Sequence, residues 1–123
     1  MAAGGALDLL AETARSFATE ELLPGLREAE AARARWQAGR PASPVDGVPV
    51  AWKDLFDMKG TVTTAASALL RHGPPAEADA PVVALLAGAG MVALGKTNLS
   101  EFAFSGLGLN PHFGTCANPY DSE

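Results

Sequence analysis

Two short apolar segments, residues 48–53 and 91–94, flank a connection that contains one strongly apolar stretch, Ala80–Ala89. Asp79 as an acidic cap and Pro81 in the first turn indicate that this stretch begins a helix. A strand, a connection with a helix and a second strand form, in that order, the βαβ pattern of a parallel sheet. The sequence therefore predicts an α/β fold. Because the helix is apolar around most of its circumference, we expect it to be buried, against a sheet.

Helices are also expected ahead of the first strand. Residues 6–23 carry apolar side chains at spacings of three and four, which is typical of an amphipathic helix, and Pro24–Gly25 is predicted to end it. A second helix is predicted from Leu26 to about Ala38, ending at Gly39, with its charged side chains on a solvated face. Residues 40–47 contain two prolines and a glycine, so they form a loop that leads into the first strand.

Lys53 closes the first apolar segment, where burial of an ammonium group would be expensive. In a strand, alternation places Lys53 on a face lined by small side chains, which leaves room for a second polar group or a substrate. The alternative is a strand-end lysine in solvent, or one paired with Asp54 or Asp57. The two expected faces are Val48, Val50 and Trp52 on one side, and Pro49, Ala51 and Lys53 on the other.

The charge balance limits the partners of the chain. Its 123 residues have a net charge of −5 and a pI near 4.9, without any block of lysines or arginines. Neither nucleic acid nor a membrane is therefore expected as a partner. Arg15 is the first positive charge, so the N-terminus does not indicate a secretory signal, and the one cysteine, Cys116, fits a reducing compartment. A cytoplasmic protein of single-domain size with an alanine-rich core is predicted.

No metal site is expected. The loose candidates are His72, His112, Cys116 and Asp121, and no pair of them has a recognised ligand spacing. Surface or packing roles are predicted for all four.

Gly90–Thr97 matches the phosphate-binding loop pattern G-x-x-x-x-G-K-[ST]. Its variable residues are Met, Val, Ala and Leu, which favour a buried strand over an anion-binding loop. Asn98–Glu101 nevertheless has the chemistry of a helix start, as such a loop requires. A P-loop-like nucleotide binder using Gly90–Thr97 therefore stays a minor alternative.

Several motifs follow one another along residues 40–121: Gly47–Asp54, Gly60 with Thr63–Ser67, Asp79–Val83, Gly90–Asn98, Glu101–Phe102, Phe113–Thr115 and Asn118–Asp121. In this order and at this spacing they closely resemble the amidase signature family. The resemblance implies one partial amidase domain over residues 1–123. Residues 1–39 would be a helical lead-in, and residues 40–123 the start of the signature core, with βαβ-type strands of a mixed sheet.

The resemblance also implies an activity. Members of this family hydrolyse or transfer amide bonds through a Ser–cis-Ser–Lys triad, without a metal or organic cofactor. Lys53 matches the catalytic lysine, which accepts a proton through the bridging serine from the nucleophilic serine. Ala103 and Phe104 match substrate-binding positions, whereas Phe102 is expected to be a core side chain. The implied substrate is a small-molecule amide.

The sequence departs from the family pattern at Ala66, where glycine is common, and at Cys116, where proline is common. It also contains no Gly-Gly-Ser-Ser-Gly-Gly stretch, in which the family carries the bridging serine and oxyanion-hole amides. We therefore expect a truncated N-terminal portion, inactive alone, that forms a homodimer or associates with a complementing C-terminal fragment. The alternative is a non-catalytic interaction module that docks a partner at an exposed sheet edge. The serines, none of them in the family setting, are Ser16, Ser43, Ser67, Ser100, Ser105 and Ser122.

Overall fold

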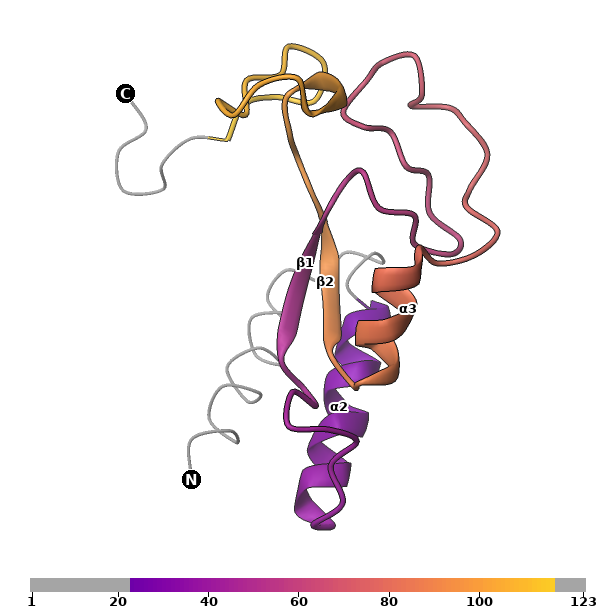
Figure 1. Ribbon diagram of the computed structural model, residues 1–123, viewed down its shortest axis with the longest axis vertical. Helices are drawn as coiled ribbons and strands as arrows, with labels where there is room; N and C mark the ends of the chain where they lie inside the picture. Colours follow the sequence, from indigo (N-terminus) through magenta and orange to yellow (C-terminus); the bar gives the residue numbers. More distant parts are fainter. Residues whose placement is uncertain (1–22, 117–123) are drawn as a thin grey trace. The chain divides into compact units, whose positions relative to one another are not determined.

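The computed structural model describes residues 23–116 (Figure 1). The helix predicted over residues 6–23 lies outside this range, apart from its last residue. No helix of the described part is long and apolar enough to cross a membrane. The elements in chain order are α2 (Leu23–Gln37), β1 (Pro49–Lys53), α3 (Pro81–Gly88), β2 (Val92–Thr97) and the short 3-10 turn η2 (Glu101–Ala103).

β1 and β2 form a two-stranded parallel sheet, and α3 lies on the connection between them (Figure 1). Hydrogen bonds at the two ends of the strands show the parallel register, because the residue numbers of both partners increase in the same direction. The amide of Val92 donates to the carbonyl of Val48 at 2.9 Å, and the amide of Asp54 donates to the carbonyl of Thr97 at 3.1 Å. The predicted α/β class and βαβ order are therefore confirmed. β2 is longer than predicted, because it continues through Gly95–Thr97.

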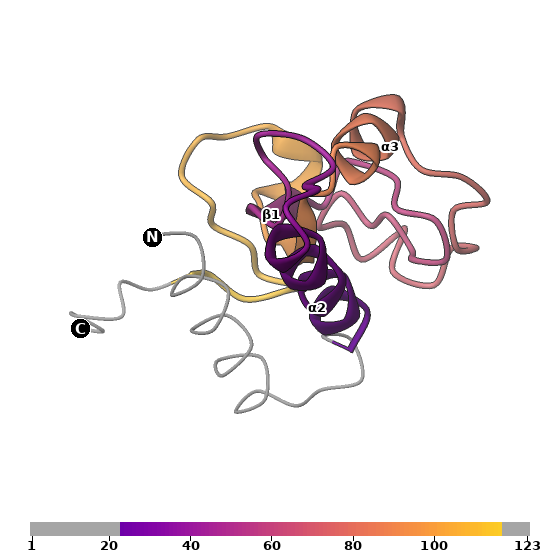
Figure 2. The same ribbon diagram turned by 90° about the horizontal axis from the view of Figure 1, so that it is seen from below.

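The chain divides into two compact units, and the two strands pass through both. We call the first the helical unit; its described residues are 23–51 and 84–95. We call the second the loop unit; its described residues are 52–83 and 96–116. Between β1 and α3 the loop unit has no helix or strand, as both views show (Figure 2).

In the helical unit, α2 lies close to β2. A Cβ atom at Gly25 would lie 2.5 Å from the carbonyl oxygen of Ala93, so only glycine permits this approach. The carboxylate of Glu28 accepts a hydrogen bond from the Ala93 amide at 3.1 Å, and is not merely part of a solvated face as predicted. The second helix begins earlier than predicted, at Leu23 instead of Leu26, with Pro24 and Gly25 in its first turn, where proline is tolerated. The helix that Pro24–Gly25 was predicted to end lies outside the described residues.

A carboxylate–guanidinium pair fixes the loop between α2 and β1. Arg35 donates from Nε and from a terminal nitrogen to the two carboxylate oxygens of Asp46, at 2.8 and 2.6 Å. The amide of Ala42 donates to the same carboxylate at 2.8 Å, and the indole of Trp36 donates to the Asp46 carbonyl at 2.8 Å. Hydrogen bonding from Arg35 lowers the pKa of Asp46 from its ordinary value, although burial acts in the opposite direction.

The expectation that the helix after residue 80 is buried is wrong. Among the described residues of α3, Val83 is the only buried one, and the Leu85 side chain is 70% exposed. An apolar helix is covered all round only when it is packed on several sides. A sheet of two strands offers too little surface for that.

The loop unit is held together by small buried residues and one buried amide. Ala65 and Ala66 are buried, and the Asn110 amide nitrogen donates to the carbonyls of Ala66 and Leu99 at 2.7 and 3.1 Å. The amide oxygen of Asn110 accepts from the backbone of residues 112 and 113 at 2.8 and 2.9 Å. With Ala29 and Ala32 in the helical unit, these buried positions confirm the alanine-rich core that was predicted.

Candidate active site

Lys53 is the last residue of β1, and its side chain is exposed. The predicted alternation is confirmed along this strand, because Trp52 is buried whereas Pro49 and Ala51 are exposed with Lys53. Within residues 23–116, the Lys53 ammonium group has no hydrogen-bond or ion-pair partner. Of the readings that the sequence left open, the exposed strand-end lysine is therefore the observed one, without a pairing to Asp54 or Asp57.

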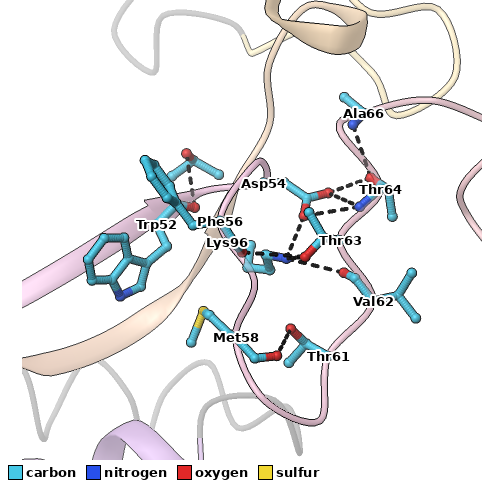
Figure 3. Close-up of polar contacts among 11 residues, drawn as sticks. Trp52, Asp54, Phe56, Met58, Thr61, Val62, Thr63, Thr64, Ala66 and Lys96 are labelled. Atoms are coloured by element: carbon cyan, nitrogen blue, oxygen red, sulfur yellow. Dashed lines mark hydrogen bonds and ion pairs between the residues drawn. The ribbon is translucent and has the colours of Figure 1, made fainter. Parts of the chain in front are cut away.

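The neighbouring carboxylate of Asp54 is engaged within the loop unit (Figure 3). Its two oxygens accept from the Thr64 amide at 3.3 and 3.2 Å, and Oδ2 also accepts from the Thr64 hydroxyl. The Nζ atom of Lys96 lies 2.7 Å from Oδ1 in an ion pair. Residue 54 therefore has both a local hydrogen-bond partner and a charged partner from β2.

Lys96 is the enclosed lysine of this region. Its ammonium group donates to the Thr63 hydroxyl at 2.9 Å and to the Val62 carbonyl at 3.2 Å, in addition to the ion pair with Asp54 (Figure 3). The side chains of Lys96 and Asp54 are 16% and 14% exposed. An ammonium group has three donors, so these contacts use all of them.

The backbone around this ion pair is linked through successive turns. The amide of Ala65 donates to the Asp54 carbonyl at 3.0 Å, and the amide of Phe102 donates to the Ala65 carbonyl at 2.9 Å. The amides of Leu55 and Phe56 both donate to the Lys53 carbonyl, at 2.6 and 3.1 Å. The main chain on both sides of the Lys53–Asp54 peptide is thus held by hydrogen bonds.

The phosphate-binding alternative is contradicted by the structure. Gly95, Lys96 and Thr97 lie in β2 rather than in a loop, and the helix predicted after Asn98 is reduced to the three-residue turn η2. The donors of Lys96 are already bonded to protein oxygens. A phosphate cradle requires a flexible loop followed by a helix N-terminus, and neither is present in this segment.

The predicted substrate-binding residues lie at η2. Phe104 is 96% exposed and Ala103 is half-buried. The expectation that Phe102 is a core residue is wrong, since its side chain is 54% exposed. Phe102 and Ala103 both have positive φ angles, 51° and 57°, so this segment turns away from the helical path that would have buried one face. Substrate contact by Ala103 and Phe104 stays a prediction.

A surface hollow of about 540 Å³ in the loop unit is lined by Asp57, Thr63 and residues 74–81. Thr63 connects its wall to the ion pair, because the Thr63 hydroxyl accepts from Lys96. Among residues 23–116, no three histidine, cysteine or acidic side chains are grouped so that they would hold a metal ion. His72, His112 and Cys116 are exposed, and Asp121 lies outside the described residues.

The sequence patterns did not predict the ion pair between Lys96 and Asp54, because they indicated Lys96 only as a phosphate ligand. A signal was available, because the carboxyl ends of parallel strands meet at one edge of a sheet. Asp54 directly follows β1 and Lys96 is the penultimate residue of β2. Opposite charges at these two positions predict a pair once the register is known.

Comparison with known proteins defines the family. The family model described as Amidase matches residues 6–123. A glutamyl-tRNA(Gln) amidotransferase subunit from Aromatoleum aromaticum is 41% identical over 116 residues, which are 94% of this chain and 23% of that protein. The 1-carboxybiuret hydrolase subunit AtzE of Pseudomonas sp. (strain ADP) is 43% identical over 95 residues, 77% of this chain and 21% of that protein. The chain belongs to the amidase family.

Solved structures agree with this assignment. The peptide amidase of Stenotrophomonas maltophilia aligns with a TM-score of 0.68 and 34% identity, over 84% of this chain and 22% of that one. A vestigial protein complex linked to the origins of an s-triazine catabolic enzyme aligns with a TM-score of 0.79 and 36% identity, over 98% of this chain and 29% of that one. The chain therefore spans only about a fifth to a third of the length of these relatives.

Proposed function

We propose that this chain supplies the lysine-bearing part of an amidase that cleaves carbon–nitrogen amide bonds. The observation that carries the proposal is the position of Lys53, exposed and without a partner among residues 23–116 at the carboxyl end of a parallel strand. Ligands of open α/β sheets bind at this end of the strands. Family membership supplies the reaction class.

In the proposed mechanism Lys53 is the base of a Ser–cis-Ser–Lys triad. In its neutral form it takes a proton from a bridging cis-serine, which in turn takes one from the nucleophilic serine. The nucleophile attacks the amide carbonyl, the proton held by Lys53 returns through the bridging serine to the amide nitrogen, the carbon–nitrogen bond breaks, and the amine leaves as an acyl-enzyme forms. Water then releases the acid, or another amine receives the acyl group. Ala103 and Phe104 at η2 are the proposed substrate contacts.

The serines of this mechanism are proposed to come from outside residues 1–123, which contain no Gly-Gly-Ser-Ser-Gly-Gly stretch. Several apolar side chains of the loop unit are strongly exposed, and burying them against such a polypeptide would be favourable. Leu69 is 85% exposed and Leu107 is 76% exposed, both in the loop unit with Phe104. Residues 1–123 alone are expected to show no turnover.

The test is a chimera in which residues 1–123 replace the matching segment of the Stenotrophomonas peptide amidase, assayed for hydrolysis of a peptide amide. The chimera is expected to be active. Lys53→Met is expected to lower kcat by at least about a hundredfold, as expected when a general base is removed. Lys59→Met is the matched control, because Lys59 is also exposed and lies in the same unit.

Activity in the Lys53→Met chimera at the level of the Lys59→Met control would refute the role of Lys53. Turnover by the 123-residue chain alone, lost in Lys53→Met, would instead refute the need for a second polypeptide while keeping the base.

A further inference from the structure

Lys53 and Asp54 are chain neighbours of opposite charge, yet they are not paired. Each oxygen of the Asp54 carboxylate already has partners inside the loop unit. Oδ1 is bound by Lys96 and by the Thr64 amide, and Oδ2 is bound by the Thr64 amide and hydroxyl. The carboxylate nearest to Lys53 along the chain is thus neutralised by a different lysine.

The position of Lys96 on β2 explains why this lysine, and not Lys53, pairs with Asp54. β2 carries Lys96 to the strand end beside Asp54, and the amide of Asp54 donates to the carbonyl of the next residue, Thr97, at 3.1 Å. The remaining donors of Lys96 are occupied by Thr63 and Val62. Because the ammonium is anchored at three points, it holds the carboxylate in one place.

We propose that Lys96 is a positioning residue that keeps the Asp54 carboxylate away from Lys53, so that Lys53 stays without an anionic partner. The catalytic meaning of this inference rests on the proposed function. A base must lose its proton, and a free carboxylate beside an amine favours the protonated ammonium form. Neutralising Asp54 removes that influence without removing Asp54.

A purely structural ion pair predicts something different. If Lys96 and Asp54 only stabilise the loop unit, breaking the pair lowers stability and leaves the relative reactivity of Lys53 unchanged. If Lys96 withholds Asp54 from Lys53, breaking the pair lowers the reactivity of Lys53, and removing the charge of Asp54 as well restores it.

The test is competitive labelling of the full 123-residue chain at neutral pH with a trace of acetic anhydride, which reacts with neutral amines. Mass spectrometry gives the labelling of Lys53 relative to Lys59, an exposed lysine of the same unit that serves as internal reference. Lys96→Met is expected to lower this ratio by about threefold, the size of a weak exposed ion pair. Lys96→Met combined with Asp54→Asn is expected to return it to the wild-type value.

Two further variants guard against loss of the fold. Lys96→Gln keeps hydrogen-bond donors for Thr63 and Val62 without the charge, and is expected to behave like Lys96→Met. Lys96→Arg keeps the charge and is expected to keep the wild-type ratio. An unchanged ratio in Lys96→Met and Lys96→Gln, or a double variant as low as the single one, would overturn the proposal.

This experiment is independent of turnover. A shifted ratio together with an active Lys53→Met chimera would refute the catalytic role and keep the positioning. An unchanged ratio together with a chimera that depends on Lys53 would refute the positioning and keep the base.

Discussion

Among the described residues, a partly buried acid–base pair lies in each of the two units, and the two pairs differ in what lies beside them. In the helical unit, Asp46 takes two nitrogens of Arg35 in a bidentate arrangement that closes a loop. In the loop unit, Asp54 takes the single ammonium nitrogen of Lys96 and directly follows the exposed Lys53. The chemistry is similar, but only the second pair has a charged residue, Lys53, directly beside it in the chain. The chain neighbour of an ion pair is therefore as informative as its geometry.

The units also differ in how they accommodate positive φ angles. The helical unit uses glycine for them, at Gly39, Gly47, Gly90 and Gly95. Among the described residues, the non-glycine residues with positive φ all lie in the loop unit; they are Ala65, Ala66, Phe102 and Ala103. Backbone strain of this kind costs free energy and tends to gather at functional sites. Here it is placed in the two segments that join at the Ala65–Phe102 hydrogen bond.

The largest expected effect tests the use of glycine in the helical unit. Gly90 has φ of 89°, and a Cβ atom there would collide with the Asp46 carboxylate. Gly90→Ala is expected to lower the free energy of unfolding by about 3 kcal/mol, because it adds backbone strain and displaces the buried Asp46 carboxylate from Arg35. Urea unfolding of the full chain measures this loss.

Gly88→Ala is the control for that substitution. Gly88 lies in α3 without a positive φ, and a Cβ atom there would meet nothing within 4 Å. Alanine is expected to stabilise the helix by about 0.5 to 1 kcal/mol. A loss at Gly90 smaller than about 1 kcal/mol would contradict the account of the Asp46 site.

The next effect concerns the acid dependence of the Arg35–Asp46 pair. The pKa of Asp46 in the folded chain is lowered, first by the hydrogen bonds from Arg35, so the folded state binds this proton less readily than the unfolded state. The stabilisation is therefore complete above the ordinary pKa of 3.8 and is lost as the pH falls below it, toward the lowered value.

Asp46→Asn removes the titrating carboxylate, so the stability of this variant should lack the acid dependence that Asp46 gives the wild-type chain. At neutral pH the substitution is expected to cost about 2 kcal/mol, less than the loss of a fully buried pair because the Arg35 side chain is 37% exposed. The difference from the wild-type chain should shrink between about pH 4 and pH 2, where Asp46 itself becomes protonated. A constant difference over that range, measured by urea unfolding, would show that the pair carries no linked proton.

The smallest effect tests the strain in the loop unit. Ala103 has φ of 57° and is half-buried, so Ala103→Gly is expected to raise the free energy of unfolding by about 0.5 kcal/mol. Ala68→Gly is the matched control: Ala68 is exposed in the same unit without a positive φ, and glycine there is expected to destabilise by a similar amount. Equal signs for the two substitutions would remove the distinction between the units.

The sequence predicted the features of the fold that depend on local periodicity. Alternation along residues 49–53 predicted which side of β1 carries Lys53, and the order of apolar segments predicted the parallel pairing with β2. The sequence did not fully predict which apolar side chains are buried, because burial depends on packing by other parts of the chain. Leu85 and Phe102 are apolar and were expected to be buried, but burial depends on what packs over a side chain and not on its own chemistry.

Of the two lysines at the candidate site, the sequence singled out only Lys53. Lys53 stood out because a charge closed an apolar segment, whereas Lys96 was hidden in a pattern that suggested a phosphate ligand. The Lys96–Asp54 contact joins positions far apart in the chain and becomes visible only with the strand register. Local patterns carry no information on this register, so the enclosed lysine can be distinguished from the exposed one only after the two strands are aligned.

The buried amide of Asn110 has a consequence for how folding of this chain is observed. It ties residues 66, 99, 112 and 113 together in a region where, among the described residues, helix is confined to the 3-10 turn η2. Far-ultraviolet circular dichroism responds to helices and strands, so it will under-report the ordered fraction of the loop unit. Slow hydrogen exchange at the amides of His112 and Phe113 will report it instead, because a protected amide needs a stable acceptor and not a regular element.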